Sequence, residues 1–293
     1  MLEKTTVEIL ERIRTPFYFY DMELLAATVD RIVSLSSKYD INVHYAVKAN
    51  VDRRIMEYIS SSGLGADCVS GNEVLYAIEC GFGPDNTVFA GVGKSDREIY
   101  SALKAGISSF NCESLQEMFV IDAMAGALGL KANVSARINP DIDAHTHKYV
   151  TTGLSENKFG ISSHEFNDLT EMIGRCNNIN FTGLHFHIGS QITEVSDVFS
   201  LEARRVNEIV TYFENTGLEI KNVDFGGGLG VDYEEPDENS IPDFDKWFKA
   251  IVSNYPRRPG QHLHIEPGRA VVAQCGPLVS RVLFVKIGET KTF

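Results

Sequence analysis

The sequence predicts an α/β protein built on a (β/α)8 barrel of the TIM type. Eight short apolar segments alternate with segments of helical spacing, and a barrel of this kind occupies about 250 residues. Polar residues follow the ends of the apolar segments, where barrel enzymes place their sites. A doubly wound open sheet is the alternative, and the position of these polar residues favours the barrel.

The predicted elements alternate along the chain after a short strand at 17–20. The barrel strands are predicted near residues 43–49, 65–70, 87–91, 108–112, 132–139, 181–188, 222–226 and 262–266. Helices are predicted near residues 22–39, 52–62, 71–80, 95–105, 114–128, 163–175, 197–216 and 242–254. Apolar residues share one stripe of the helix at 197–216, which indicates a face packed against a core.

Three of these helices carry a chemical start signal. Each begins with the pattern Ser-x-x-Glu directly after a predicted strand, which is typical of a capping box. The three pairs are Ser70 and Glu73, Ser95 and Glu98, and Ser114 and Glu117.

The ends of the chain do not fit a closed barrel. Residues 270–286 are apolar without helical spacing, so we expect residues 270–293 to form the first strands of a C-terminal β domain. We expect residues 21–269 to form the barrel and residues 1–20 to pack with the β domain. We expect that domain to continue beyond Phe293 by roughly a hundred residues in the natural protein, the size of a small domain.

Composition argues against several classes of protein. The chain has 40 acidic and 27 basic residues and a net charge of −13, whereas nucleic-acid binding needs a basic face. No apolar run approaches the length of about 18 residues that spans a membrane, and the start lacks a signal-peptide pattern. Five scattered cysteines without a CxxC pair predict neither a disulfide framework nor a zinc ribbon. We expect a cytoplasmic protein without nucleic-acid or membrane partners.

Lys48 ends the apolar run of the first barrel strand. An ammonium group in such a place is costly to desolvate unless it is paired or chemically converted. A lysine held in this way has a lowered pKa and can attack a carbonyl to form a Schiff base. We interpret Lys48 as the residue that holds pyridoxal phosphate (PLP). A snorkelling lysine at a strand end is the alternative.

Two further strand ends carry features that fit a phosphorylated, planar cofactor. His185 and His187 share one face of a strand. Three interpretations are open: the two histidines bind a metal, they are hydrogen-bonded residues of the core, or one ring stacks on a planar cofactor. No third zinc ligand follows at ligand spacing, so we predict no metal site. Three glycines, Gly226–Gly228, follow the next strand and let backbone N–H groups approach a phosphate, with a flexible hinge as the alternative.

Glu266 ends the last barrel strand, just before a Pro-Gly turn. A carboxylate there can keep a pyridinium nitrogen protonated, which makes the ring a strong electron sink and favours decarboxylation over racemisation. A charged surface turn is the alternative. Asp67 and Arg137 also lie at strand ends. Either an ion pair within the barrel or direct contact with the cofactor would explain their positions.

The long connection 140–161 predicts a lid, with a merely mobile loop as the alternative.

Six motifs occur together in the order of a known family. They are Tyr45–Asn50, Ala66–Glu73, Lys158–Ile161, His185–Gln191, Gly226–Gly228 and Glu266–Arg269. In this order they resemble the PLP-dependent decarboxylases of the alanine-racemase-like fold, the group that holds ornithine, arginine and diaminopimelate decarboxylases. The double-histidine strand and the Lys-Phe-Gly-Ile loop are most similar to the diaminopimelate branch. The resemblance extends from Pro16 to Phe293.

The resemblance implies a role for each site residue. The catalytic residues would be Lys48, which holds PLP covalently, His187, which stacks on its ring, and Glu266, which binds its nitrogen. The phosphate would be held by Gly226, Gly227 and Gly228, with Ser190 and the backbone near Gly268 and Arg269. Asp67 and Arg137 would lie around the cofactor, and Arg269 would also reach a substrate carboxylate. His185 would not touch PLP and would only support the residues that do.

The resemblance also implies an activity. We expect decarboxylation of meso-2,6-diaminopimelate to L-lysine by a homodimer with shared active sites. In this family a C-terminal domain supplies a cysteine and a tyrosine to the site, and none of the five cysteines here lies in such a context. One alternative is a decarboxylase of another basic amino acid, such as ornithine or arginine. The other is a non-catalytic, single-barrel PLP carrier, which would not need Glu266.

Overall fold

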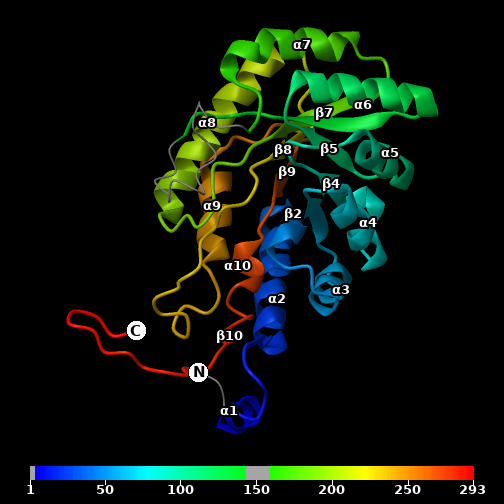
Figure 1. The fold of residues 1–293 in the computed structure, drawn as a ribbon. Coiled ribbons are helices and arrows are strands. Elements are labelled where there is room, and N and C mark those ends of the chain that lie inside the picture. Colours follow the sequence, from blue (N-terminus) through cyan, green and yellow to red (C-terminus); the bar gives the residue numbers. More distant parts are fainter. Residues whose placement is uncertain (1–3, 143–158) are drawn as a thin grey trace.

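A computed structural model describes residues 4–142 and 159–293 of the chain. Eight parallel strands close into a barrel in the order β2 to β9, and helices surround it (Figure 1). The barrel closes where β2 pairs with β9, with Val43 opposite Ile265. The predicted (β/α)8 barrel is therefore confirmed.

The strands and helices lie close to their predicted positions. The barrel strands are β2 (Ile41–Ala46), β3 (Gly65–Cys68), β4 (Thr87–Phe89), β5 (Ser109–Cys112), β6 (Ala132–Arg137), β7 (Ile179–His185), β8 (Asn222–Asp224) and β9 (His262–Ile265). The main helices are α2 (Met22–Tyr39), α3 (Arg53–Ser61), α4 (Gly71–Glu79), α5 (Asp96–Ala105), α6 (Leu115–Leu128), α7 (Phe166–Arg175), α8 (Val195–Asn215) and α9 (Phe244–Asn254).

The apolar core lies between the strands and the surrounding helices. The predicted stripe of α8 is buried, and Phe199 packs against Trp247 of α9 with ring centroids 5.3 Å apart. Burial of each such aromatic side chain stabilises the fold by about 1.5–3 kcal/mol. The inside of the barrel is different, because buried polar side chains from several strands meet there, among them Asp67, Asp224 and Glu266.

Only one of the three predicted capping boxes is completed as predicted. At the start of α5, Glu98 accepts the backbone N–H of Ser95. Ser70 and Ser114 accept the expected N–H groups of α4 and α6, but the glutamate of each motif reaches one residue further back. Glu73 accepts the N–H of Val69 and Glu117 that of Glu113. The longer reach of these glutamates holds the first residue after β3 and after β5.

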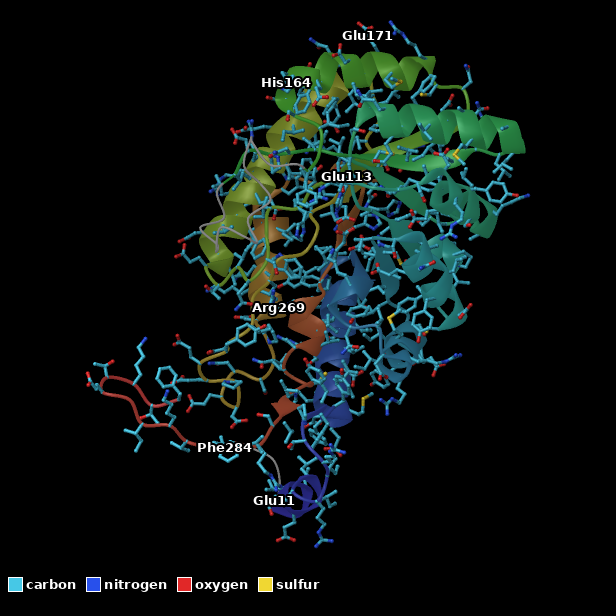
Figure 2. The ribbon with its side chains drawn as sticks, in the orientation of Figure 1. Glu11, Glu113, His164, Glu171, Arg269 and Phe284 are labelled. Carbon is cyan, nitrogen blue, oxygen red and sulfur yellow. The ribbon has the colours of Figure 1, made fainter. Side chains whose placement is uncertain are left out.

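The ends of the chain form a small separate sheet. β1 (Phe17–Tyr18) pairs antiparallel with β10 (Leu278–Val279), and a helix, α1 (Lys4–Leu10), precedes it. We expected the segment after residue 270 to be strand without helix, and this expectation is wrong for its first residues. Arg269–Val272 form a helical turn, α10, in which Ala273 donates to the carbonyl of Arg269. Beyond β10 the segment extends away from the barrel and carries the exposed Phe284 (Figure 2).

The predicted lid falls mainly on residues 143–158, which lie outside the described residues. The part that is described, Phe159–Ile161, runs beside the end of β6, where Ile138 and Ile161 form a bridge. Within the described residues, no helix combines the length and apolarity that a membrane crossing requires.

Candidate active site

A cavity of about 450 Å³ opens at the carboxyl ends of the barrel strands. Its volume lies in the range of small-molecule and cofactor sites. The structure brings many of the predicted residues to its wall. These residues are Lys48, His187, Ser190, Gly228, Glu266, Gly268 and Arg269. Strand ends far apart in the sequence therefore meet at one place, as a barrel requires.

Lys48 lies just past β2, in a short 3₁₀ turn formed by Val47–Ala49. Its side chain is 49% exposed, and its Nζ atom lies 3.3 Å from Oδ2 of Asp67. The adjacent Asp67 carboxylate raises the pKa of Lys48 and outweighs the opposing effect of burial. The lowered lysine pKa expected from the sequence is therefore wrong, because a strand-end carboxylate lies beside the ammonium group.

Asp67 is almost fully buried beneath this lysine. Burial and the nearby Glu266 raise the pKa of Asp67 to about 6, although Lys48 acts in the opposite direction. Its second oxygen, Oδ1, has no hydrogen-bond donor among the described residues. Unpartnered buried acceptors are rare, and a polar molecule bound nearby would supply a donor.

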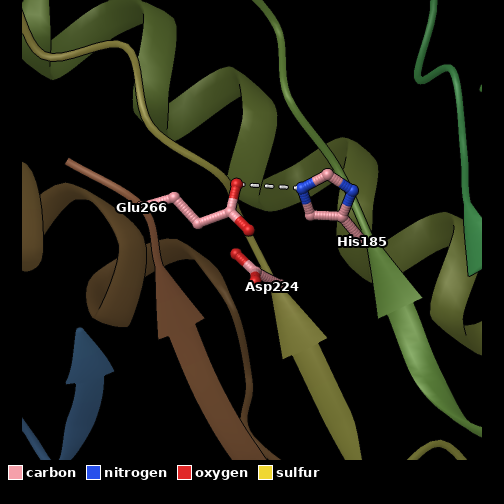
Figure 3. A group of neighbouring side chains, drawn as sticks. All are labelled: His185, Asp224 and Glu266. Atoms are coloured by element: carbon pink, nitrogen blue, oxygen red, sulfur yellow. Dashed lines mark hydrogen bonds and ion pairs between the residues drawn. The ribbon is translucent and has the colours of Figure 1, made fainter. Parts of the chain in front are cut away.

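Glu266 is buried at the base of the cavity and is held on both oxygens. His185 donates through Nε2 to Oε2 at 3.0 Å (Figure 3). Asn111 donates to Oε1 at 3.4 Å. Burial alone would raise the pKa of Glu266, but His185 and Lys48 bring it well below its usual value. An ionised carboxylate at this position can hold a protonated ring nitrogen.

His187 and the glycine run pack against each other. The backbone N–H of Gly227 donates to Nδ1 of His187 at 3.1 Å. Burial and the nearby Arg137 lower the pKa of His187 well below its usual value, so its ring is neutral. A side chain on Gly227 would collide with the carbonyl oxygen of Glu266, and one on Gly228 would lie 2.8 Å from that of Gly189. Close packing therefore requires glycine at both positions.

Arg269 reaches the mouth of the cavity from the start of α10. It donates to the hydroxyl of Tyr233 at 2.7 Å and to Ser190 at 3.4 Å. Sequence reasoning missed Tyr233, which also lines the cavity. Its signal was weak, because it lies in an acidic loop several residues after the glycine run.

Arg137 lies close enough to Lys48 and His187 to lower the pKa of His187 and to oppose the rise in the pKa of Lys48. It is not among the described residues that line the cavity, and it pairs with Glu113 at 2.6 Å. Glu113 also accepts the backbone N–H groups of Gly91 and Gly160, so it connects its own loop to two neighbouring loops. Sequence reasoning missed Glu113, although it directly follows a predicted strand.

These residues fit PLP. The cavity offers an amine at Lys48, an ionised carboxylate at Glu266 and a neutral flat ring at His187. The unpartnered Oδ1 of Asp67 beside Lys48 adds an acceptor that a bound polar group would satisfy.

Comparisons with known proteins identify the family of the chain. The sequence profile described as "Pyridoxal-dependent decarboxylase, pyridoxal binding domain" matches residues 25–273. Diaminopimelate decarboxylase of Bacteroides thetaiotaomicron is 46% identical over 288 residues, which cover 98% of this chain and 74% of that protein.

Solved structures similar to this chain include proteins with the same name. Diaminopimelate decarboxylase of Helicobacter pylori, complexed with L-lysine, matches with a TM-score of 0.85 and 35% identity over 98% of this chain and 71% of that one. The enzyme of the same name from M. jannaschii matches with a TM-score of 0.88 and 32% identity, over 98% of this chain and 68% of that one.

Proposed function

The chain belongs to the pyridoxal-dependent decarboxylases, and we propose that it decarboxylates meso-2,6-diaminopimelate to L-lysine. One observation of the structure carries this proposal: Lys48 and Glu266 line the same cavity. The substrate follows from the similarity to relatives named diaminopimelate decarboxylase and to structures that hold lysine.

We assign the cofactor contacts as follows. Lys48 would hold PLP covalently, and Glu266 would bind the ring nitrogen. His187 would lie against the ring, with Asp67 beside Lys48. The glycines Gly226, Gly227 and Gly228, with Ser190, Gly268 and Arg269, would hold the phosphate, and Arg137 would act near the cofactor through its neighbours. PLP supplies an electron sink for the bond that loses carbon dioxide.

The remaining steps belong to side chains of the chain itself. Arg269 would bind a substrate carboxylate, with Tyr233 fixing the guanidinium group. Binding at two fixed points orients the scissile bond, and such orientation supplies several kcal/mol of a barrier by analogy with effective molarities of roughly 10⁵–10⁸ M. The ionised Glu266 would hold a proton on the ring nitrogen throughout.

We also propose that the protein works in the cytoplasm as a homodimer. The five cysteines are unpaired, which suits a reducing compartment. The exposed apolar run Val282–Val285 offers a surface that another part of the protein or a second subunit could cover. Light scattering of the purified protein measures the subunit count.

Two measurements test the function. The purified protein should show the absorbance of bound PLP, and Lys48→Ala should lose it while Lys104→Ala, a change on the exposed face of α5, should keep it. Carbon dioxide release should then be measured with diaminopimelate, ornithine and arginine. Preference for ornithine or arginine would establish the alternative substrate, and PLP binding without release from any of them would indicate a carrier.

A further inference from the structure

Asp224 lies at the centre of a buried cluster with His185 and Glu266. The three side chains come from the ends of neighbouring strands β7, β8 and β9 and point toward one another (Figure 3). One ligand atom of each lies within 4.8 Å of the others. Nothing described so far explains a second carboxyl group at this place.

Two carboxylates this close together and buried cannot both carry a charge at modest cost. The charge belongs to Glu266, because His185 and Asn111 donate to its two oxygens. Among the described residues, Asp224 receives only the backbone N–H of Gly226, on Oδ1 at 2.8 Å. This difference in donors favours the negative charge on Glu266.

We propose that Asp224 is a neutral carboxylic acid whose Oδ2 hydroxyl donates a hydrogen bond to the carboxylate of Glu266. Oδ1 is the carbonyl oxygen, since it accepts the N–H of Gly226. Asp224 is thus a positioning residue, which keeps Glu266 charged and fixes the direction of its oxygens. It does not touch the reacting atoms.

The electrostatics of the pair agree with this geometry. Burial, and then the adjacent Glu266, raise the pKa of Asp224 well above its usual range. The pKa of Glu266 moves in the opposite direction, because His185 and Lys48 outweigh its burial. Pairs of acids whose environments push their pKa values apart are a common way of dividing roles in enzyme sites.

A metal ion is the competing explanation for three ligand types in one place. In this cluster, however, Nε2 of His185 lies 3.0 Å from Oε2 of Glu266 and is used in that hydrogen bond, while Nδ1 of the ring is buried without a partner among the described residues. A single proton on Asp224 then removes the repulsion between the two carboxyl groups without a metal ion. Stoichiometric zinc bound by the apo-protein and lost in Asp224→Asn would overturn the proposal.

The protonation of Asp224 is independent of cofactor binding, whereas its benefit to PLP rests on the proposed function. Infrared spectra of apo-protein labelled with ¹³C-aspartate should show a protonated-carboxyl band at pH 7 that is absent in Asp224→Asn. The aspartate label excludes Glu202, another buried acid. Identical spectra of the two proteins would overturn the proposal even if PLP binds normally.

A substitution series then measures the positioning role. Asp224→Asn keeps a donor toward Glu266, and Asp224→Ala removes it. We expect Asp224→Ala to weaken PLP binding about tenfold more than Asp224→Asn does, the usual effect of a hydrogen bond to a charged group. Circular dichroism confirms that both variants fold. Equal losses in both would show that Asp224 acts as an ion, which contradicts the proposal.

Discussion

Two buried carboxyl groups near Lys48 respond to the same surroundings in opposite ways. Glu266 has donors on both oxygens and remains charged, whereas Asp67 has one unpartnered oxygen and a pKa of about 6. Burial acts on both acids, and the neighbouring His185 decides that the pKa of Glu266 falls while that of Asp67 rises.

Asp67 controls the reactivity of Lys48. Because the Asp67 carboxylate raises the pKa of Lys48, Asp67→Asn should lower that pKa and speed the covalent capture of PLP at pH 7 several-fold. The difference should vanish well below pH 6, where Asp67 of the parent protein is itself protonated. Stopped-flow absorbance across this pH range measures it, with the exposed Asp85→Asn as control. A slower capture in Asp67→Asn would contradict the assignment.

Tyr233 should affect substrate binding more than turnover. Its hydroxyl accepts a hydrogen bond from Arg269, so Tyr233→Phe should leave the guanidinium group less well oriented. We expect KM to rise roughly fivefold with a small change in kcat, since one hydrogen bond to a charged group is lost. Tyr100→Phe, a change at an exposed site on α5, is the control. An unchanged KM would remove Tyr233 from the site.

At the scale of elements, the glycine run connects β8 to the site through close packing. A methyl group on Gly227 would push against the carbonyl of Glu266, so Gly227→Ala should displace that residue. We expect weaker PLP binding and a loss of about 1–3 kcal/mol in the free energy of unfolding. Gly93→Ala is the matched control, because a Cβ at Gly93 meets nothing within 4 Å. Equal behaviour of both variants would exclude this packing role.

Helix α8 contains an acid that the mechanism does not use. Glu202 is fully buried, and neither of its oxygens has a partner in the part of the chain that the structure describes. Burial raises its pKa well above the usual value, so the folded state keeps this proton to a higher pH than the unfolded state does. The contribution of Glu202 to stability is therefore fully present below the ordinary pKa of a glutamate and is lost as the pH rises toward its raised pKa in the folded state.

Replacement of Glu202 should remove the cost of burying a carboxyl group without hydrogen-bond partners. Glu202→Leu should raise the free energy of unfolding at pH 7 by about 1–3 kcal/mol, since a buried polar group without partners is lost. Glu202→Gln should abolish the pH dependence that Glu202 causes and keep the polar burial. Urea unfolding at pH 4 and pH 7 measures both effects. A destabilised Glu202→Leu would indicate that the carboxyl group has a partner.

At the scale of the whole molecule, local patterns predicted the barrel and much of its site. Apolar spacing marks each strand and helix, and a barrel brings strand ends together, so Lys48 and Glu266 could be placed at one face. The partners of the site residues could not be predicted, because the Lys48–Asp67 and Arg137–Glu113 pairs depend on which strands become neighbours. The raised pKa of Lys48 followed from such a contact and not from any local pattern.

The helical turn at Arg269–Val272 was missed for a related reason. Its apolar residues show no helical period over a single turn, and Gly268, Arg269 and Val272 line the cavity. The prediction that residues 270–293 begin a β domain, packed with residues 1–20, stays a prediction. The pairing of β1 with β10 is consistent with it.

The central claim is that PLP is bound covalently by Lys48 above Glu266. Borohydride reduction of the PLP-loaded protein, followed by proteolysis and mass spectrometry of the peptides, tests it most directly. We predict that the added mass lies on the peptide that contains Lys48 and on no other lysine. Modification of a different lysine, or of none, would contradict the account.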